Sequence, residues 1–197
     1  MMLSDVPGPD VLPSHWMALA DRPALNVATL RELIGSEPHL VDWLLPHRQE
    51  DPDKPYGRKV LLDGSCLEVM VAAWTPGVFC APHDHGGSQG VVHVLQGRVR
   101  HRIYSVDNGE LEVVREEVTG SGDLVVCGRN LIHAMGDDGA QAPLVTLHLY
   151  TGPVQHMTVY DEARRRTLKV DGGCGAWVPP DGSASILESW NGILPTL

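Results

Sequence analysis

The sequence lacks any long apolar segment. No run of residues approaches the roughly 18 to 20 consecutive apolar side chains that a membrane-spanning helix needs. The opening segment, MMLSDVPGPD, is acidic and rich in proline, whereas a secretory signal peptide starts with basic and then apolar residues. We therefore expect a cytoplasmic protein that has no membrane partner.

Basic residues and cysteine pairs are also scarce. Fifteen Lys and Arg side chains stand against 25 Asp and Glu side chains, and the net charge of −10 would repel a nucleic-acid backbone. The four cysteines are far apart and form no C-x-x-C pair, which disfavours a disulfide framework and a zinc site built from thiolates. Nucleic acid is therefore not expected as a partner, and the thiols are expected to be reduced.

The sequence does contain enough apolar material for one folded domain. Its 197 residues are 43% hydrophobic and 20% charged, close to globular averages. Near the start, Leu30, Leu33 and Ile34 follow one another at helical spacing, and Asn26 stands where an N-cap is expected. We assign residues 1–54 to a helical N-terminal segment that packs on the rest of the protein.

Residues 58 to about 161 alternate short apolar runs with turn signals, for example KVLL before DGS and LEVMVAAW before TPG. No helical pattern separates these runs, so parallel βαβ architecture is disfavoured. Many short antiparallel strands favour an all-β core, a double-sheet jelly-roll barrel. We place this core at 55–165 and a C-terminal extension at 166–197, in which the Gly-, Pro- and Ser-rich stretch 171–185 is expected to wrap the barrel.

Two of the ten histidines form the H-x-H pair His83 and His85. If this segment is a β-strand, both imidazoles emerge on one face and can chelate one ion. A third histidine, His133, follows a Gly-Asp turn, a short strand and a second turn, so two inward-facing strands would bring the three side chains together. An H-x-H pair can also be exposed and bind nothing, and the pattern by itself leaves both interpretations open.

The segment LVTLHLYTG alternates polar and apolar residues. Thr146, His148 and Tyr150 share one face of the predicted strand, and apolar residues occupy the other. One interpretation exposes the polar face to solvent, as in a half-covered sheet. The other points this face into the barrel, where the three side chains would hydrogen-bond in series beside the metal.

Tyr56 and Arg58 stand at the start of the first predicted strand. Arginine is usually a surface residue. A guanidinium group that faces into a barrel needs an anionic partner, and its rigid fork suits a carboxylate group. Arg58 therefore predicts an acidic substrate if it faces inward.

Several segments, in order, resemble the cysteine dioxygenase family of thiol dioxygenases within the cupin superfamily: HDH with its glycine-rich sequel, VLQGRV, GD before IHAM, and LHLYTGPVQHMTVYD. The resemblance covers about residues 56–161 and implies the cupin double-stranded β-helix. It also implies that His83, His85 and His133 bind one iron(II) ion. The usual cupin glutamate ligand is missing from the following GGSQGVV, which favours a site of three histidines.

The same resemblance assigns roles to five further residues. Arg58 would hold the substrate carboxylate, and Tyr56 occupies a substrate-binding position of the family. Thr146, His148 and Tyr150 would form the Ser-His-Tyr relay of the family, with threonine keeping the hydroxyl group of serine. His148 would orient Tyr150, whose hydroxyl group would contact oxygen or the substrate sulfur.

Gly90 stands where animal cysteine dioxygenases have a cysteine that crosslinks to the active-site tyrosine. No such thioether can form in this chain, which in this respect resembles many bacterial members of the family.

The resemblance implies a non-haem iron(II) enzyme that adds both atoms of O2 to the sulfur of a small carboxylated thiol. Arginine at position 58, as in bacterial members of arginine type, favours L-cysteine, with cysteine sulfinic acid as product. A 3-mercaptopropionate dioxygenase and a non-catalytic cupin that only binds metal are the alternatives. The expected partners are a small thiol and O2, and the expected state is a monomer or a weak homo-oligomer.

Overall fold

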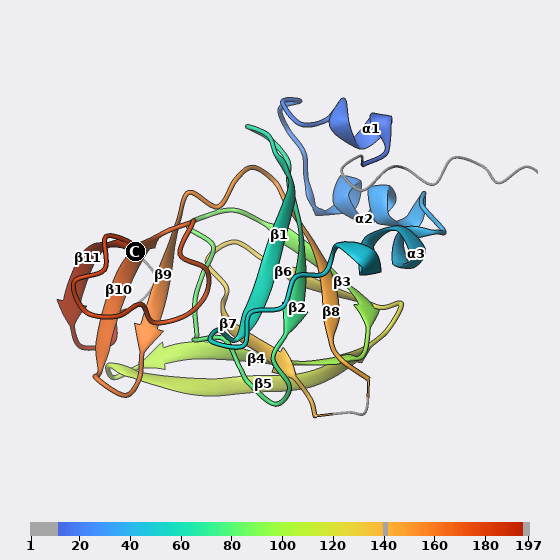
Figure 1. Cartoon of the computed structure of the whole chain (residues 1–197). Helices are drawn as coiled ribbons and strands as arrows, with labels where there is room; N and C mark the ends of the chain where they lie inside the picture. Colours follow the sequence, from blue (N-terminus) through green and yellow to red (C-terminus); the bar gives the residue numbers. More distant parts are fainter. Residues whose placement is uncertain (1–11, 140–141, 195–197) are drawn as a thin grey trace, which may run out of the picture.

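The computed structural model describes residues 12–139 and 142–194 (Figure 1). The helical elements are α1 (Ser14–Met17), α2 (Val27–Gly35), α3 (Leu40–Leu44) and the 3₁₀ turn η1 (Leu45–His47). The strands are β1 (Tyr56–Asp63), β2 (Glu68–Trp74), β3 (Gly90–Gln96), β4 (Arg98–Asp107), β5 (Glu110–Gly120), β6 (Leu124–Cys127), β7 (Ile132–Asp137), β8 (Val145–Tyr150), β9 (His156–Asp161), β10 (Arg166–Asp171) and β11 (Ile186–Asn191). Within these ranges, no helix has the length and apolar character needed to cross a membrane.

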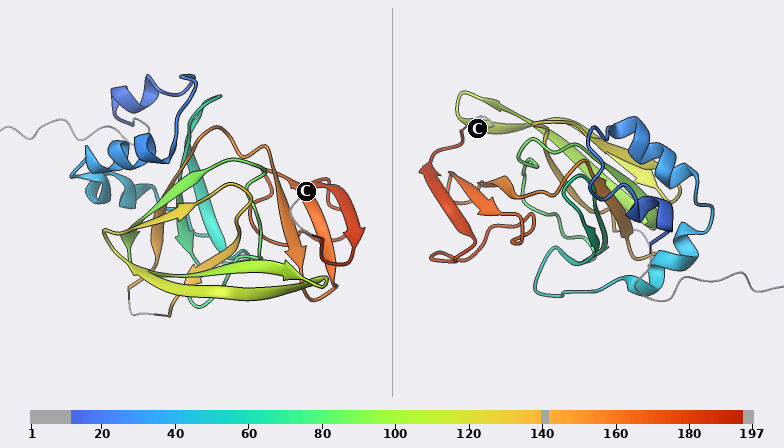
Figure 2. Two further views of the ribbon diagram at one scale, coloured as in Figure 1. Left: turned by 180° about the vertical axis from the view of Figure 1, so that it is seen from behind. Right: turned by 90° about the horizontal axis from the view of Figure 1, so that it is seen from above.

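Two sheets form the barrel (Figure 2). One has five strands in the order β1-β2-β8-β3-β6, and the other has three in the order β5-β4-β7. Every strand pair in both sheets is antiparallel, and several neighbours, such as β2 and β8, are distant in sequence. This arrangement is the double-stranded β-helix, or jelly-roll barrel, of the cupins. The expected all-β core with a short helical N-terminal segment is confirmed.

Helix α2 forms where the spacing of apolar residues predicts it. The Asn26 side chain accepts a hydrogen bond from the Thr29 amide at 3.1 Å and so caps the first turn. Leu30, Leu33 and Ile34 are the buried residues of this helix. Both the N-cap and the apolar face are therefore confirmed.

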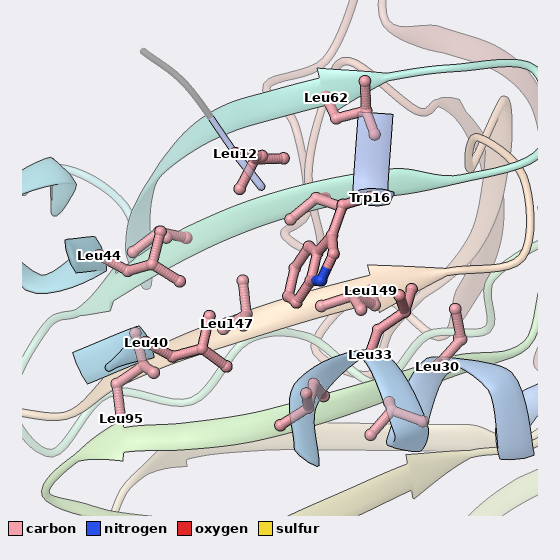
Figure 3. Packing of buried hydrophobic residues seen from close by; sticks show 14 of the residues in the cluster. Leu12, Trp16, Leu30, Leu33, Leu40, Leu44, Leu62, Leu95, Leu147 and Leu149 are labelled. Atoms are coloured by element: carbon pink, nitrogen blue, oxygen red, sulfur yellow. The ribbon is translucent and has the colours of Figure 1, made fainter. Parts of the chain in front are cut away.

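The helices cover the outer face of the five-stranded sheet. Trp16 of α1 is fully buried and belongs to one apolar cluster with Leu33 of α2 and with Leu147 and Leu149 of β8 (Figure 3). Each fully buried side chain of this size contributes about 1.5–3 kcal/mol. Because the helices bury the apolar face of β8, the opposite, polar face is left to point into the barrel.

A third sheet, in the order β11-β10-β9, lies at the end of the barrel away from the helices (Figures 1 and 2). After β10 the chain turns back along the barrel, and the Gly172 amide donates to the Gln155 carbonyl at 2.9 Å. A Cβ atom at Gly172 would lie 1.6 Å from the Val154 carbonyl oxygen. Only glycine therefore permits this close approach, which brings the residues after 172 to the cavity described below.

We expect the Trp16→Ala substitution to lower the free energy of unfolding by about 3–5 kcal/mol, because it empties a fully buried site. Trp16→Phe should cost much less, since it keeps an aromatic ring and removes an indole N–H that has no hydrogen-bond partner within residues 12–139 and 142–194. Urea denaturation measures both effects, with Met17→Ala, at a position that is 46% exposed, as the control. A loss in Trp16→Ala no larger than in the control would contradict this packing.

Candidate metal centre

His83 and His133 lie on two segments that are joined by a reciprocal pair of backbone hydrogen bonds. The amide of each residue donates to the carbonyl of the other, at 2.9 Å in both directions. His133 belongs to β7, and His83 is bridged to it from the loop that follows β2. The prediction that the two histidine segments converge is confirmed.

The H-x-H segment is not a regular strand, in contrast to the strand considered from the sequence. His83 forms only isolated bridges, to His133 and to Val159 of β9. The Asp84 carboxylate accepts hydrogen bonds from the Gly86 amide at 2.9 Å and the Thr158 amide at 3.3 Å. These bonds tie Asp84 to β9 and promote a turn directly after the pair, which stops strand pairing.

The three imidazoles present their Nε2 atoms to one point. The Nε2 atom of His85 lies 3.2 Å from that of His83 and 3.4 Å from that of His133. Two nitrogen atoms that each bind one ion at about 2.1 Å are about 3 Å apart when they subtend a right angle at it. The three nitrogens thus have the spacing of ligands that share one side of a single metal ion.

Burial keeps these histidines neutral. His83, His85 and His133 are each at most 5% exposed. Desolvation lowers the pKa of His83 to about 4, although the Ala81 carbonyl and Asp84 act in the opposite direction. Desolvation, and to a lesser degree the neighbouring histidines, lowers the pKa values of His85 and His133 well below the usual value. Neutral imidazoles with converging nitrogen lone pairs are metal ligands, and a cation relieves their mutual repulsion. The residues present therefore fit a divalent ion.

The group that could hold the ion contains no carboxylate among the described residues. His83 has its Nδ1 atom 2.9 Å from the Ala81 carbonyl, which accepts a hydrogen bond from Nδ1–H and so leaves the Nε2 lone pair for the metal. A site of three neutral ligands keeps the full charge of the ion, so it favours anionic ligands such as a thiolate.

The polar face of β8 is buried beside this centre. Thr146 Oγ1 lies 2.8 Å from His148 Nε2, and His148 Nδ1 lies 3.1 Å from the Tyr150 hydroxyl oxygen. That hydroxyl group is 3.4 Å from Nε2 of His85. The interpretation of these residues as a hydrogen-bonded series facing into the barrel is confirmed, and the solvent-facing alternative is wrong.

Burial also fixes the protonation of this series. It lowers the pKa of His148 to about 3, with a smaller effect of His83, and it raises the pKa of Tyr150 well above the usual value, with buried acidic groups acting in the same direction. Tyr150 therefore keeps its proton at neutral pH and can donate it as a hydrogen bond.

Two aromatic residues support the series from β1 and β2. The Trp74 indole donates a hydrogen bond of 2.8 Å to Thr146 Oγ1. The Tyr56 ring lies against the Trp74 ring, with centroids 4.8 Å apart, and its hydroxyl group accepts a bond of 2.9 Å from the Ala176 amide. Tyr56 thus connects the wall of the cavity to the C-terminal segment.

Arg58 reaches the same segment. Its Nη2 atom donates to the carbonyl groups of Gly172, at 3.1 Å, and Gly173, at 2.7 Å. The guanidinium group therefore has backbone carbonyl acceptors, whereas an anionic partner was expected from the sequence. It is partly exposed and lies between two adjoining pockets.

The inner pocket is a cavity of about 30 Å³ bordered by the three histidines, Tyr150 and Arg58, and the outer, more open one measures about 460 Å³. Glu68 of β2 borders both pockets, and its carboxylate accepts a hydrogen bond of 3.0 Å from the Val154 amide. Burial, only partly offset by this bond, raises the pKa of Glu68. The inner space is small enough to admit only a small group to the metal centre.

Sequence reasoning missed Glu68 as a cavity residue and His101 as a contact of the metal site. Strand alternation offered a signal for His101, which shares a strand face with the buried Val99. Glu68 is placed by its register with Tyr150 of β8, a tertiary contact that local alternation does not show. Neither position stands in a recognisable motif.

The family model for cysteine dioxygenase type I matches residues 19–163, well over half of the 197 residues. Similar solved structures include an uncharacterised conserved protein with a double-stranded β-helix domain from Klebsiella pneumoniae, which has 17% identity and a TM-score of 0.48 over 61% of this chain and 94% of that chain. KdgF from Halomonas sp. has 18% identity and a TM-score of 0.43 over 54% and 89% of the two chains. A cupin 2 domain-containing protein from Halorhodospira halophila has 20% identity and a TM-score of 0.41 over 52% and 68%.

The family match spans α2, α3 and the barrel, including the loop that carries His83 and His85 and the strand β7 that carries His133. On this basis the chain belongs to the cysteine dioxygenase type I family.

Proposed function

We propose that this protein is a non-haem iron(II) thiol dioxygenase that converts L-cysteine and O2 to cysteine sulfinic acid. Both oxygen atoms go to sulfur, so one thiol and one O2 give one sulfinic acid with no further reductant. The observation that carries the proposal is the convergence of three neutral histidines, a protonated tyrosine and an arginine on one small cavity.

His83, His85 and His133 would hold the iron through their Nε2 atoms. Bound there, iron(II) would supply the redox chemistry that lets a thiolate react with O2, which thiols do only slowly without a metal. The protein has to bind the thiol, orient it and supply hydrogen bonds where charge develops.

Arg58 is the proposed anchor of the substrate carboxylate, because its guanidinium group borders the cavity and is already oriented by the Gly172 and Gly173 carbonyls. Tyr56 is the proposed neighbour of the bound thiol on the same side. The Glu68 carboxyl group borders the same cavity, where it could accept hydrogen bonds from a substrate that also carries an ammonium group. L-Cysteine has both charges, whereas 3-mercaptopropionate has only the carboxylate.

Tyr150 is the proposed donor to the reacting atoms. Trp74 donates to Thr146, which in turn can donate its hydroxyl proton to His148 Nε2. His148 then carries its proton on Nδ1 and donates it to the Tyr150 oxygen. The Tyr150 proton is left to point into the cavity, toward the substrate sulfur or oxygen.

We expect the iron-loaded protein to consume O2 with L-cysteine and to form one sulfinate per O2, because the proposed reaction needs no other reactant. A chelator should abolish uptake, and iron(II) should restore it. Oxygen electrode traces and mass spectrometry of the product measure both quantities. The same measurements are made with two further thiols, 3-mercaptopropionate, which lacks the amine, and cysteamine, which lacks the carboxylate.

Faster turnover of 3-mercaptopropionate would assign that substrate instead. Absence of uptake with every thiol by a protein that binds iron would leave a non-catalytic metal-binding cupin and contradict the proposal.

Arg58→Ala should raise the KM for L-cysteine about 10–100-fold, since hydrogen bonds to a charged group contribute about 1.5–3 kcal/mol. Iron content, measured by atomic absorption, should stay unchanged because Arg58 does not contact the histidines. Arg129→Ala, which removes an exposed arginine elsewhere, is the matched control. Equal loss of iron and of substrate binding would mean that Arg58 has a structural role only.

Gly90→Ala should lower kcat about 100-fold through a displacement of Tyr150. A Cβ atom at position 90 would lie 2.5 Å from Cδ1 of the Tyr150 ring, so the ring must move. Gly120→Ala is the control, because a Cβ atom there meets nothing within 4 Å. Steady-state kinetics at equal iron content make the comparison, and full activity in Gly90→Ala would refute the role given to Tyr150.

A further inference from the structure

His101 of β4 is a fourth buried histidine at the metal centre. It is 1% exposed, and its Nε2 atom lies 2.9 Å from Nδ1 of His133. It is not a member of the group whose nitrogens converge on the ion position. His101 therefore contacts the far nitrogen of a ligand, on the side of the ring that points away from the metal.

A charged pair stands behind His101. Glu117 of β5 is directly opposite His101 in the antiparallel register of β4 and β5. Its Oε1 atom lies 3.5 Å from Nδ1 of His101, which makes no hydrogen bond within the described ranges, so the carboxylate is the acceptor that this nitrogen faces. Its other oxygen lies 2.7 Å from Nη2 of Arg115 on the same strand. The two contacts place the Glu117 carboxylate between Arg115 and the His101 imidazole.

The positions of the protons follow from the two ends of this series. A neutral His133 that binds metal through Nε2 carries its proton on Nδ1, and so it donates to Nε2 of His101. His101 must then be neutral with its proton on Nδ1, facing the Glu117 carboxylate, which can only accept. In this arrangement each group has one role compatible with its neighbours, and the Glu117 carboxylate faces the His101 proton.

We propose that His101, with Glu117 behind it, is a positioning residue that fixes the metal-binding tautomer and the ring orientation of His133. The inference rests on the metal centre of the proposed function. It goes beyond that function because it says which residues outside the ligand set determine the tautomer and orientation of His133. The other two ligands have no comparable partner: His83 meets a backbone carbonyl, and Nδ1 of His85 has no hydrogen-bond partner among the described residues.

The test is the affinity for Co²⁺, measured by titration of the metal-free protein with a competing chelator, together with the visible spectrum of the Co²⁺ complex. His101→Phe keeps an aromatic ring but removes the acceptor, and should weaken Co²⁺ binding about 10–100-fold, the usual effect of losing such a partner. His101→Gln offers a side-chain carbonyl oxygen to the His133 proton and should recover most of the affinity and the unmodified spectrum. Glu117→Leu, on a partly exposed edge position, should weaken binding several-fold.

His93→Phe is the matched control, because His93 is a partly buried barrel histidine whose Nδ1 meets the Asp123 carbonyl and not a ligand. It should leave Co²⁺ affinity unchanged. Imidazole ¹⁵N shifts of the metal-free protein add a readout that does not need activity: His133 should carry its proton on Nδ1 in the unmodified protein and in His101→Gln, and lose this preference in His101→Phe.

Unchanged Co²⁺ affinity in His101→Phe would overturn the proposal, as would equal losses in the Phe and Gln variants, which would assign the effect to packing. If Glu117→Leu binds as the unmodified protein does, the part given to Glu117 is wrong. Failure of the unmodified protein to bind Co²⁺ or iron(II) is a separate result, and it would overturn the metal centre and the proposed function together.

Discussion

The reciprocal backbone pair between His83 and His133 is the constraint on which the site depends. It joins a loop and a strand that are 50 positions apart in sequence, and it sets two imidazoles opposite each other before any metal binds. His85 is then placed by the turn that Asp84 holds against β9. One pair of main-chain bonds and one side-chain carboxylate therefore fix the position of the ligands to within the tolerance of a single ion.

The helices stabilise the site indirectly, by covering the outer face of strand β8. Its apolar residues need a hydrophobic cover on the outside, because the inside is taken by Thr146, His148 and Tyr150. The cover comes from α1, α2 and α3, with Trp16 against Leu149 (Figure 3). A polar series inside a barrel is thus stable because every hydroxyl and imidazole group in it has a partner, and because the opposite face of the same strand is fully buried.

The sequence allowed much of this to be predicted, and its limits have physical causes. Strand alternation and the N-cap at Asn26 depend on neighbours in the chain, so local pattern revealed them. The role of His101 was not predicted, because the flanking Arg100 and Arg102 give the segment the pattern of an exposed strand. The two arginines in fact occupy the other face of the strand. The roles of Glu68 and of the Gly172 carbonyl were not predicted either, because they depend on tertiary contacts that no local sequence pattern encodes.

The tether between Arg58 and Gly172 spans 114 positions of the chain, and this distance has a consequence for biosynthesis. A chain grows from its N-terminus, and its early parts begin to fold before the last residues are made. All three histidines and the Thr146, His148 and Tyr150 series emerge before Gly172, Gly173 and Ala176 do. A nascent chain can therefore assemble its metal ligands while Arg58 and Tyr56 still lack their acceptor and donor, and the wall of the cavity closes last.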